Sequence, residues 1–182
     1  MKTKKLLLTV VIAAFTASIF TVEARQKAYN YYQHGYWGNI EAHAGAMLGG
    51  GCDIGVSTTH GFCIGHGLAM GIGTGLYFDL AGYYYFLNVP IFLETKYSPL
   101  KQIYSPFVSL RTGFSINDLY DTGFYLSPAI GIDYKRFSLF MRYSFNLCPQ
   151  TVYISIPEMN INTNAVANVK SHAMSAGFAF NF

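Results

Sequence analysis

The chain has 182 residues, of which 52% are hydrophobic and 17% aromatic, and only 12% are charged, against about 25% in soluble domains. This balance excludes a disordered chain and argues against an ordinary soluble domain, and the length fits one domain. The formal charge of +3 at pH 7 is also too small for a nucleic-acid surface, which concentrates Lys and Arg on one face. We therefore expect no nucleic-acid partner.

Residues 1–24 have the pattern of a cleavable signal peptide. Lys2, Lys4 and Lys5 precede an apolar run over 6–20, and the small side chains of Val22 and Ala24 offer a cleavage site. The run is shorter than the roughly 20 apolar residues of a membrane anchor, and no cysteine follows it to carry a lipid. We expect an exported chain whose mature part holds 9 basic and 8 acidic residues.

Eight later segments place apolar side chains at every second position, which is typical of β-strands. The last one is the clearest, with large apolar side chains at its even positions and small or polar ones at its odd positions. The eight segments are 39–48, 56–64, 68–78, 87–97, 107–115, 124–134, 136–148 and 172–182.

The second face of these segments is mostly Gly, Ala and Ser with few charges. A soluble sandwich would turn a charged face to water, whereas small side chains fit inside a narrow barrel and large apolar ones suit lipid. A closed barrel also satisfies every backbone group in a membrane, and the segments are about the 9–11 residues that such strands need. We expect an all-β fold, an eight-stranded antiparallel up-and-down transmembrane β-barrel over 37–182. An exported sandwich is the remaining alternative.

The connections between segments suggest an orientation. They fall near 49–55, 64–67, 79–86, 98–106, 116–123, 134–136 and 149–168. With residues 25–36 as a periplasmic N-terminal segment, the odd-numbered connections face outward, including the longest one. Long outer loops with short periplasmic turns are typical of outer-membrane barrels, although 98–106 is long for an inner turn. Pro90 and Pro128 fall inside segments, where each removes a hydrogen-bond donor, so we expect them near the outer rim or at a bulge.

The signal peptide, the glycine-rich stretch 70–76 and the ending 177–182 together resemble the small eight-stranded outer-membrane β-barrel family of Gram-negative bacteria, the OmpA/OmpX-like type. The resemblance implies an outer-membrane location, with both termini in the periplasm. Phe178, Phe180 and Phe182 resemble the C-terminal signal that the barrel-assembly machinery reads. The resemblance therefore implies that machinery and outer-membrane lipid as partners.

Six charged residues fall on the face expected to line the lumen. Three are acidic and three basic, which predicts a self-neutralising interior, because isolated buried charges are costly. Glu94 and Arg111 are expected nearly opposite each other on adjacent strands. The six residues are Glu41, Glu94, Lys96, Arg111, Asp133 and Arg142. We expect them to plug the lumen; a polar route for small solutes is the alternative, although an eight-stranded barrel is too narrow for an open pore.

The remaining residues do not favour catalysis or a cofactor. Lipid A deacylases of this fold use a His-x-Ser pair, and none of the five histidines is followed by Ser two positions later. The histidines also lack the spacing of a metal site. Cys52, Cys63 and Cys148 are odd in number; a Cys52–Cys148 bridge is possible, but single thiols are favoured. We expect no enzyme activity, no cofactor and no metal.

The sequence thus predicts a monomeric outer-membrane protein with a structural or porin-like role. The alternative is a surface adhesin that binds an unidentified ligand through the connections at 79–86 and 149–168. Tyr83 to Phe86 are expected to form part of an aromatic girdle at the membrane interface.

Overall fold

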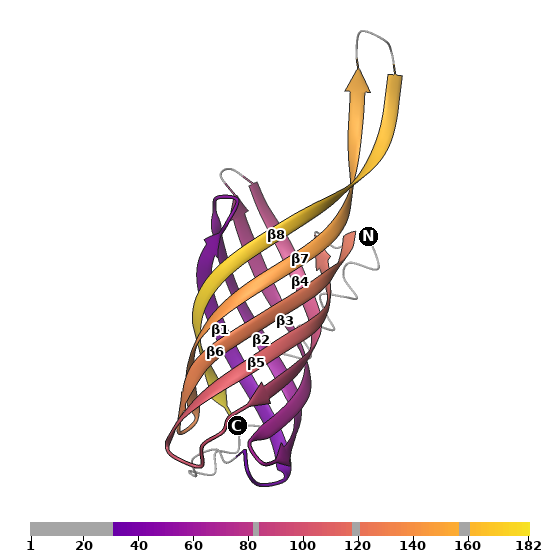
Figure 1. The fold of residues 1–182 in the computed structure, drawn as a ribbon. Helices are drawn as coiled ribbons and strands as arrows, with labels where there is room; N and C mark the ends of the chain where they lie inside the picture. Colours follow the sequence, from indigo (N-terminus) through magenta and orange to yellow (C-terminus); the bar gives the residue numbers. More distant parts are fainter. Residues whose placement is uncertain (1–30, 82–83, 118–120, 157–160) are drawn as a thin grey trace.

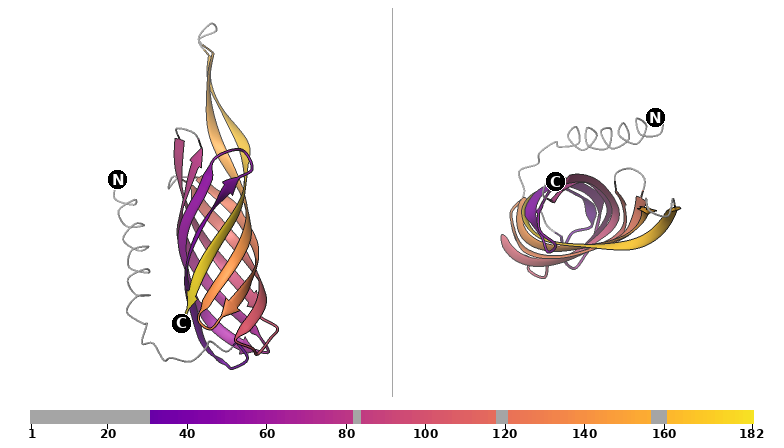
Figure 2. Two further views of the ribbon diagram at one scale, coloured as in Figure 1. Left: turned by 90° about the vertical axis from the view of Figure 1, so that its left-hand side faces the viewer. Right: turned by 90° about the horizontal axis from the view of Figure 1, so that it is seen from above.

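The computed structural model describes residues 31–81, 84–117, 121–156 and 161–182. Its eight antiparallel strands form one closed barrel in which β8 pairs with β1 (Figures 1 and 2). The strands are β1 (Gly35–Met47), β2 (Cys52–Gly65), β3 (Leu68–Ala81), β4 (Tyr84–Tyr97), β5 (Tyr104–Asn117), β6 (Asp121–Tyr134), β7 (Phe137–Ile156) and β8 (Ile161–Asn181). This closure confirms the predicted fold and excludes the sandwich, which needs two separate sheets.

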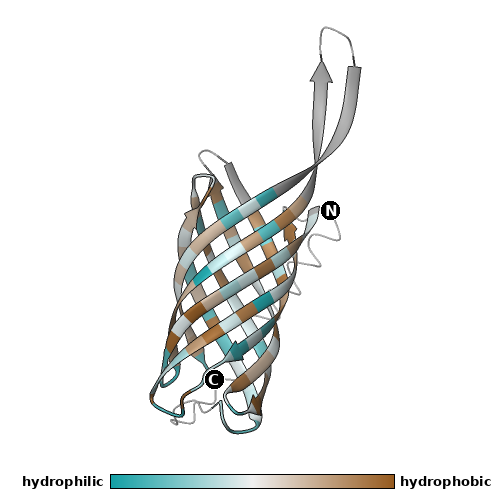
Figure 3. Cartoon of the chain, viewed as in Figure 1, coloured by the Kyte–Doolittle hydropathy of each residue, from teal (hydrophilic) through white to brown (hydrophobic). Residues whose placement is uncertain are grey.

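The two faces of each strand lie as the alternation predicts. Large apolar side chains point outward and remain exposed, as Ile72, Leu139 and Phe178 do, with 58–69% of their surface accessible. Their neighbours in sequence point into the barrel and are buried, so polar and apolar residues alternate along the strands (Figure 3). In the described part of the chain, no helix is long and apolar enough to cross a membrane.

The two ends of the barrel differ in what they carry. Tyr31 and Phe182 lie at one end, here called the terminal end, with the connections 66–67, 98–103 and 135–136. The other end, here called the hairpin end, carries the connection 48–51, the end of β3 with the start of β4, the end of β5 with the start of β6, and the end of β7 with the start of β8. At the terminal end, His66 (φ 54°) and Gly67 (φ 85°) form a two-residue turn, and a positive φ at both central positions matches the twist of a hairpin.

The prediction of a long connection over 149–168 is wrong. Residues from Pro149 onward continue β7, and they pair with the first part of β8 up to the Ile156–Ile161 pair. This two-stranded extension rises beyond the rest of the hairpin end (Figure 1). The connection 79–86 is likewise mostly strand. Consequently the expected contrast in loop length is also wrong, because the longest connection, 98–103, lies at the terminal end.

The two strand prolines occupy mid-strand positions, not the rim. Pro90 lies in the middle of β4 and Pro128 in the middle of β6. The β3–β4 ladder is interrupted beside Pro90, and the β6–β7 ladder beside Pro128. Proline has no backbone N–H to donate, so each interruption falls where the ladder lacks a donor. Thr74 donates its hydroxyl to the Pro90 carbonyl oxygen at 3.0 Å.

Candidate functional site

The centre of the lumen holds a four-residue charge cluster. Glu41 on β1 accepts two hydrogen bonds from Arg111 on β5, from Nη1 at 2.6 Å and from Nη2 at 2.7 Å. Arg142 on β7 also donates to both Glu41 oxygens, with Nη2–Oε2 at 3.2 Å. Glu94 on β4 receives Arg111 Nη2 at 2.9 Å. Two carboxylates and two guanidinium groups therefore form one connected cluster, here called the central cluster.

Neutral hydroxyl groups extend the central cluster. Thr59 donates to Glu94 Oε2 at 2.6 Å. Arg111 Nη1 donates to Ser57 Oγ at 3.2 Å and to the Tyr77 hydroxyl oxygen at 3.3 Å. Arg111 has no exposed surface, and Glu41 has 3%. Hydrogen bonds of this kind are what makes buried charge tolerable, because removal from water is costly unless the lone pairs and protons are satisfied.

Aromatic rings pack against both arginines of the central cluster. The Arg111 guanidinium carbon lies 4.4 Å from the Phe92 ring centre, and that of Arg142 lies 4.5 Å from the Phe140 ring centre. Both distances fit a cation–π contact. A β-carbon at Gly73 would lie 2.4 Å from the Phe92 ring, so the absence of a side chain there leaves room for it.

A second charge cluster, here called the lower cluster, lies toward the terminal end. Lys96 Nζ on β4 is 2.7 Å from Asp133 Oδ1 on β6, and it donates to the Tyr31 hydroxyl oxygen at 2.8 Å. Lys96 also lies 4.0 Å from the Phe107 ring centre. Ser98 donates to Asp133 Oδ2 at 3.3 Å. Tyr31 thus brings the chain preceding β1 into the mouth of the barrel.

The structure places all six predicted lumen charges inside the barrel, in two clusters. Glu94 and Arg111 are direct partners in the β4–β5 register, as their spacing predicts. The contacts of Arg111 and Arg142 with Glu41 join strands that are not neighbours, so the sequence pattern could not show them. The structural roles of Tyr31, Phe92 and Phe140 were also missed. The signal for the two phenylalanines was a large side chain on an otherwise small-residue face.

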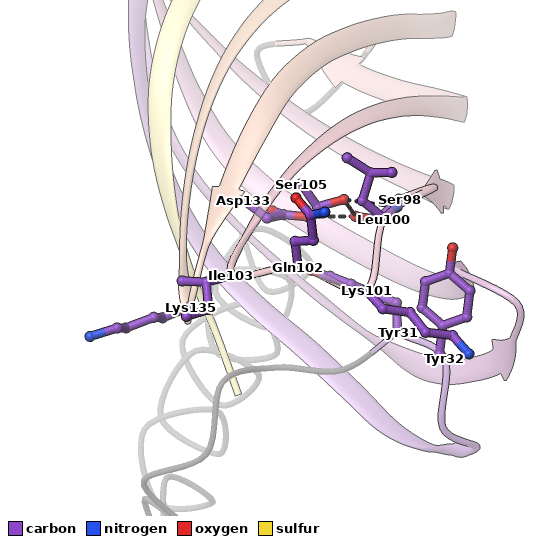
Figure 4. A pocket seen from close by; sticks show the side chains of 10 residues that line it. All are labelled: Tyr31, Tyr32, Ser98, Leu100, Lys101, Gln102, Ile103, Ser105, Asp133 and Lys135. Carbon is purple, nitrogen blue, oxygen red and sulfur yellow. Dashed lines mark hydrogen bonds between the residues drawn. The ribbon is translucent and has the colours of Figure 1, made fainter.

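Little free space remains between the two clusters. A cavity of about 10 Å³, bordered by Glu41, Glu94, Lys96, Phe107 and Arg142, has room for about one water molecule. A wider pocket of about 140 Å³ opens at the terminal end, where Lys101 and Tyr32 lie on one side and Asp133 at its inner end (Figure 4). The hydroxyl oxygens of Ser98 and Ser105 lie 2.8 Å apart there, within hydrogen-bond distance.

The C-terminal aromatic residues lie on the outer face. Phe182 pairs with Gly38 on β1 through two backbone hydrogen bonds of 2.9 and 3.0 Å, which close the barrel at the terminal end. A β-carbon at Gly38 would lie 2.6 Å from the Phe182 ring, so this glycine lets the ring lie across β1. Phe178 is exposed, and Phe180 is half-buried beside Phe137.

Tyrosines form a belt around the outside of the terminal end, here called the tyrosine belt, which the sequence analysis missed. Its members are exposed and stand where strands begin or end, and they are Tyr36, Tyr97, Tyr104 and Tyr134. The rings of Tyr104 and Tyr134 stack at 4.7 Å. Tyrosine and tryptophan collect at the height of lipid headgroups because one end of the ring is apolar and the other polar. The side chains of the expected girdle at 83–86 lie outside the described residues.

Cys52, Cys63 and Cys148 form no disulfide with one another, so the Cys52–Cys148 bridge is excluded. Within the described ranges, no group of three or more His, Cys, Asp or Glu residues is placed to hold a metal ion. The predicted signal peptide over 1–24 lies outside the described residues.

Comparison with a solved structure supports the architecture. The crystal structure of Neisserial surface protein A aligns with a TM-score of 0.53 at 20% identity, covering 81% of this chain and 96% of that one. This chain has the fold of an eight-stranded outer-membrane β-barrel. The N-terminal barrel domain of Pseudomonas aeruginosa OprF (TM-score 0.43, 12% identity) and a major outer membrane protein of Thermus thermophilus (0.45, 17%) each match over 82% of this chain and 100% of their own. No family model and no curated protein matches the sequence.

Proposed function

We propose that this chain is a structural outer-membrane barrel whose lumen is closed by its central cluster. The observation that carries this proposal is the contact of Glu41 with both Arg111 and Arg142, which joins β1, β5 and β7 across the lumen. An ion crossing the barrel would have to separate these buried charges. Their hydrogen bonds and ring contacts oppose that separation.

The outer face supports a place in a lipid membrane. The exposed apolar side chains surround a barrel that leaves no open sheet edge, as a bilayer requires. The tyrosine belt marks one membrane interface at the terminal end. With this end in the periplasm, the β7–β8 extension stands on the cell surface, and Phe182 is positioned at the periplasmic end, where we propose that the barrel-assembly machinery recognises it.

The proposed role includes no catalysis. Glu41 and Glu94 are occupied by arginines, and Asp133 by Lys96 and two serines. A carboxylate held in this way is a poor general base, because the paired cation stabilises its ionised form. The interior charges are therefore assigned to stability.

Single-channel recording in a planar bilayer tests the closed lumen. The purified folded chain should give no discrete conductance steps, whereas a variant with both Arg111→Ser and Arg142→Ser should give measurable steps, because it removes the groups that bridge the lumen. Lys170→Ser, at an exposed position of β8, is the matched control. Regular conductance steps from the parent chain would refute the plug.

A second candidate is a surface-binding role through the β7–β8 extension. The observation that favours it is the continuation of the two strands past the rim, with backbone pairing up to Ile156–Ile161. A pair of strands that projects past the rim offers edges to which another chain can add. Shortening the hairpin by removing 151–166 should abolish binding of whole cells to a ligand surface while the barrel still assembles. Unchanged binding would eliminate the extension as the binding element.

A further inference from the structure

A separate interior cavity lies toward the hairpin end, and its lining is rich in oxygen atoms. Asp53 of β2, Asp79 of β3, Asn88 of β4 and Asn146 of β7 surround it, with Ser144 and Ser171. Its volume is about 10 Å³, which is enough for one water molecule or one ion. Tyr77 also borders this cavity while its hydroxyl group contacts Arg111. The site therefore adjoins the central cluster but shares none of its carboxylates.

The charge of this cavity is not balanced by its lining. Asp53 and Asp79 are direct partners in the β2–β3 register, and both face inward. Like charges at directly opposed positions of two strands are destabilising. The described residues of the lining include no Lys or Arg; His43 is a nearby basic group, with Nε2 at 3.4 Å from Asp53 Oδ1. The predicted lumen charges, by contrast, are matched three to three.

Two buried oxygen atoms in the lining accept no hydrogen bond from the described residues, although the ring of His43 lies in ion-pair range of one of them, Asp53 Oδ1. Asn88 has 1% of its surface exposed and Asp53 has 3%, and Oδ1 of each has no hydrogen-bond partner. A buried acceptor without a donor costs about 1–3 kcal/mol, and more when it is charged. Oxygen acceptors that line a cavity the size of an ion are suited to bind a cation. A bound cation would coordinate their lone pairs and would also neutralise the negative charge of the carboxylates.

We propose that this cavity binds one hard divalent cation, with Ca²⁺ as the best match. Asp53 and Asp79 supply two negative charges, and the amide and hydroxyl groups supply neutral oxygen ligands. Carboxylate, carbonyl and hydroxyl oxygens are the ligands of hard cations, and Ca²⁺ accepts the flexible geometry that ligands from several strands provide, whereas Mg²⁺ requires a near-ideal octahedron. Four of the six oxygen-bearing residues named here are neutral, so this site contains no group of three His, Cys, Asp or Glu residues among the described residues.

Terbium luminescence on the folded full chain in chelator-free detergent tests the site. Tb³⁺ substitutes for Ca²⁺, and the ring of Tyr77 can sensitise its emission. We expect a saturable signal that Ca²⁺ displaces. Asp53→Asn and Asp79→Asn should each lower the affinity for Ca²⁺ by about tenfold or more, because ligand charge sets calcium affinity. Asn88→Asp should raise the affinity. Asp133→Asn, toward the terminal end and outside the lining, should leave the Ca²⁺ affinity unchanged.

Thermal unfolding provides a readout that distinguishes binding from an ordinary structural role. In EDTA, Asp53→Asn should be at least as stable as the parent, since it removes one of two facing charges. In millimolar Ca²⁺ the parent should gain stability, and the variant should not. No Ca²⁺-displaceable signal from the parent, or equal Ca²⁺ affinities in the parent and both Asp→Asn variants, would overturn the proposal. These outcomes do not depend on whether the lumen conducts.

Discussion

Glu41 on β1 and Arg111 on β5 meet across the full width of the lumen, with two nitrogen–oxygen distances of 2.6 and 2.7 Å. Their strands are four apart in a ring of eight, so the two residues come from opposite walls. A paired contact of this kind fixes both the distance and the orientation of the partners. It ties the walls together at the height where Arg142 also reaches Glu41.

Removing Arg111 should therefore destabilise the barrel strongly. Arg111→Ala leaves Glu94 without its arginine and takes one of two arginines from Glu41, at a cost of about 3–5 kcal/mol for a broken buried pair. Urea unfolding in detergent measures the change, with the fluorescence of the single, fully buried Trp37 as the signal. Lys170→Ala, on the exposed surface, should change the unfolding free energy little. Equal midpoints for both variants would contradict a stabilising role for Arg111.

The Tyr31 hydroxyl should contribute to stability through the lower cluster. It accepts a hydrogen bond from Lys96 and donates to Asn181 Oδ1 at 3.2 Å. Tyr31→Phe removes a partner from a buried ammonium group and should cost about 1–3 kcal/mol. Tyr32→Phe is the matched control, because its hydroxyl group bonds the Pro99 carbonyl oxygen at an exposed position. If the same urea assay gives equal losses of unfolding free energy for the two variants, the buried hydrogen bond of Tyr31 stabilises the barrel no more than the exposed bond of Tyr32.

Deleting Phe182 should reduce the amount of assembled barrel in the outer membrane. The deletion removes both the backbone pairing with Gly38 and the terminal ring of the proposed assembly signal. Assembly is measured by membrane fractionation, with Phe62→Leu, at an exposed position of β2, as the control. Refolding of the deleted chain in detergent separates recognition from stability: recognition predicts normal refolding with poor assembly. Normal assembly of the deleted chain in cells would contradict the proposal that Phe182 is part of the assembly signal.

The folded barrel should migrate differently in SDS gels before and after boiling. Its strands pair in a closed ring, so no edge is open at which unfolding can start, and folded barrels of this kind often resist SDS until heated. Arg111→Ala should lose the folded band at a lower temperature than the parent chain, because the central cluster is weakened. A single band at all temperatures, with the protein in the soluble fraction, would contradict a membrane barrel.

The sequence by itself determined the strand number, the side of the barrel that each residue faces, and the Glu94–Arg111 register. These features are local, since alternation has a period of two and the position of the connection between two adjacent strands sets their pairing. The extension of β7 and β8 was not predicted, because Pro149 directly follows Cys148 and proline is unfavourable inside a strand.

Only the tertiary structure decided which residues meet across the lumen. Strand tilt and stagger set the height at which each inward side chain lies, and neither is encoded in a single strand. Glu41 therefore finds Arg111 and Arg142 only once the barrel closes, and Tyr31 reaches Lys96 from outside β1. The same closure brings Asn88 and Asn146 to the facing carboxylates Asp53 and Asp79, which creates an oxygen-lined cavity from residues far apart in sequence.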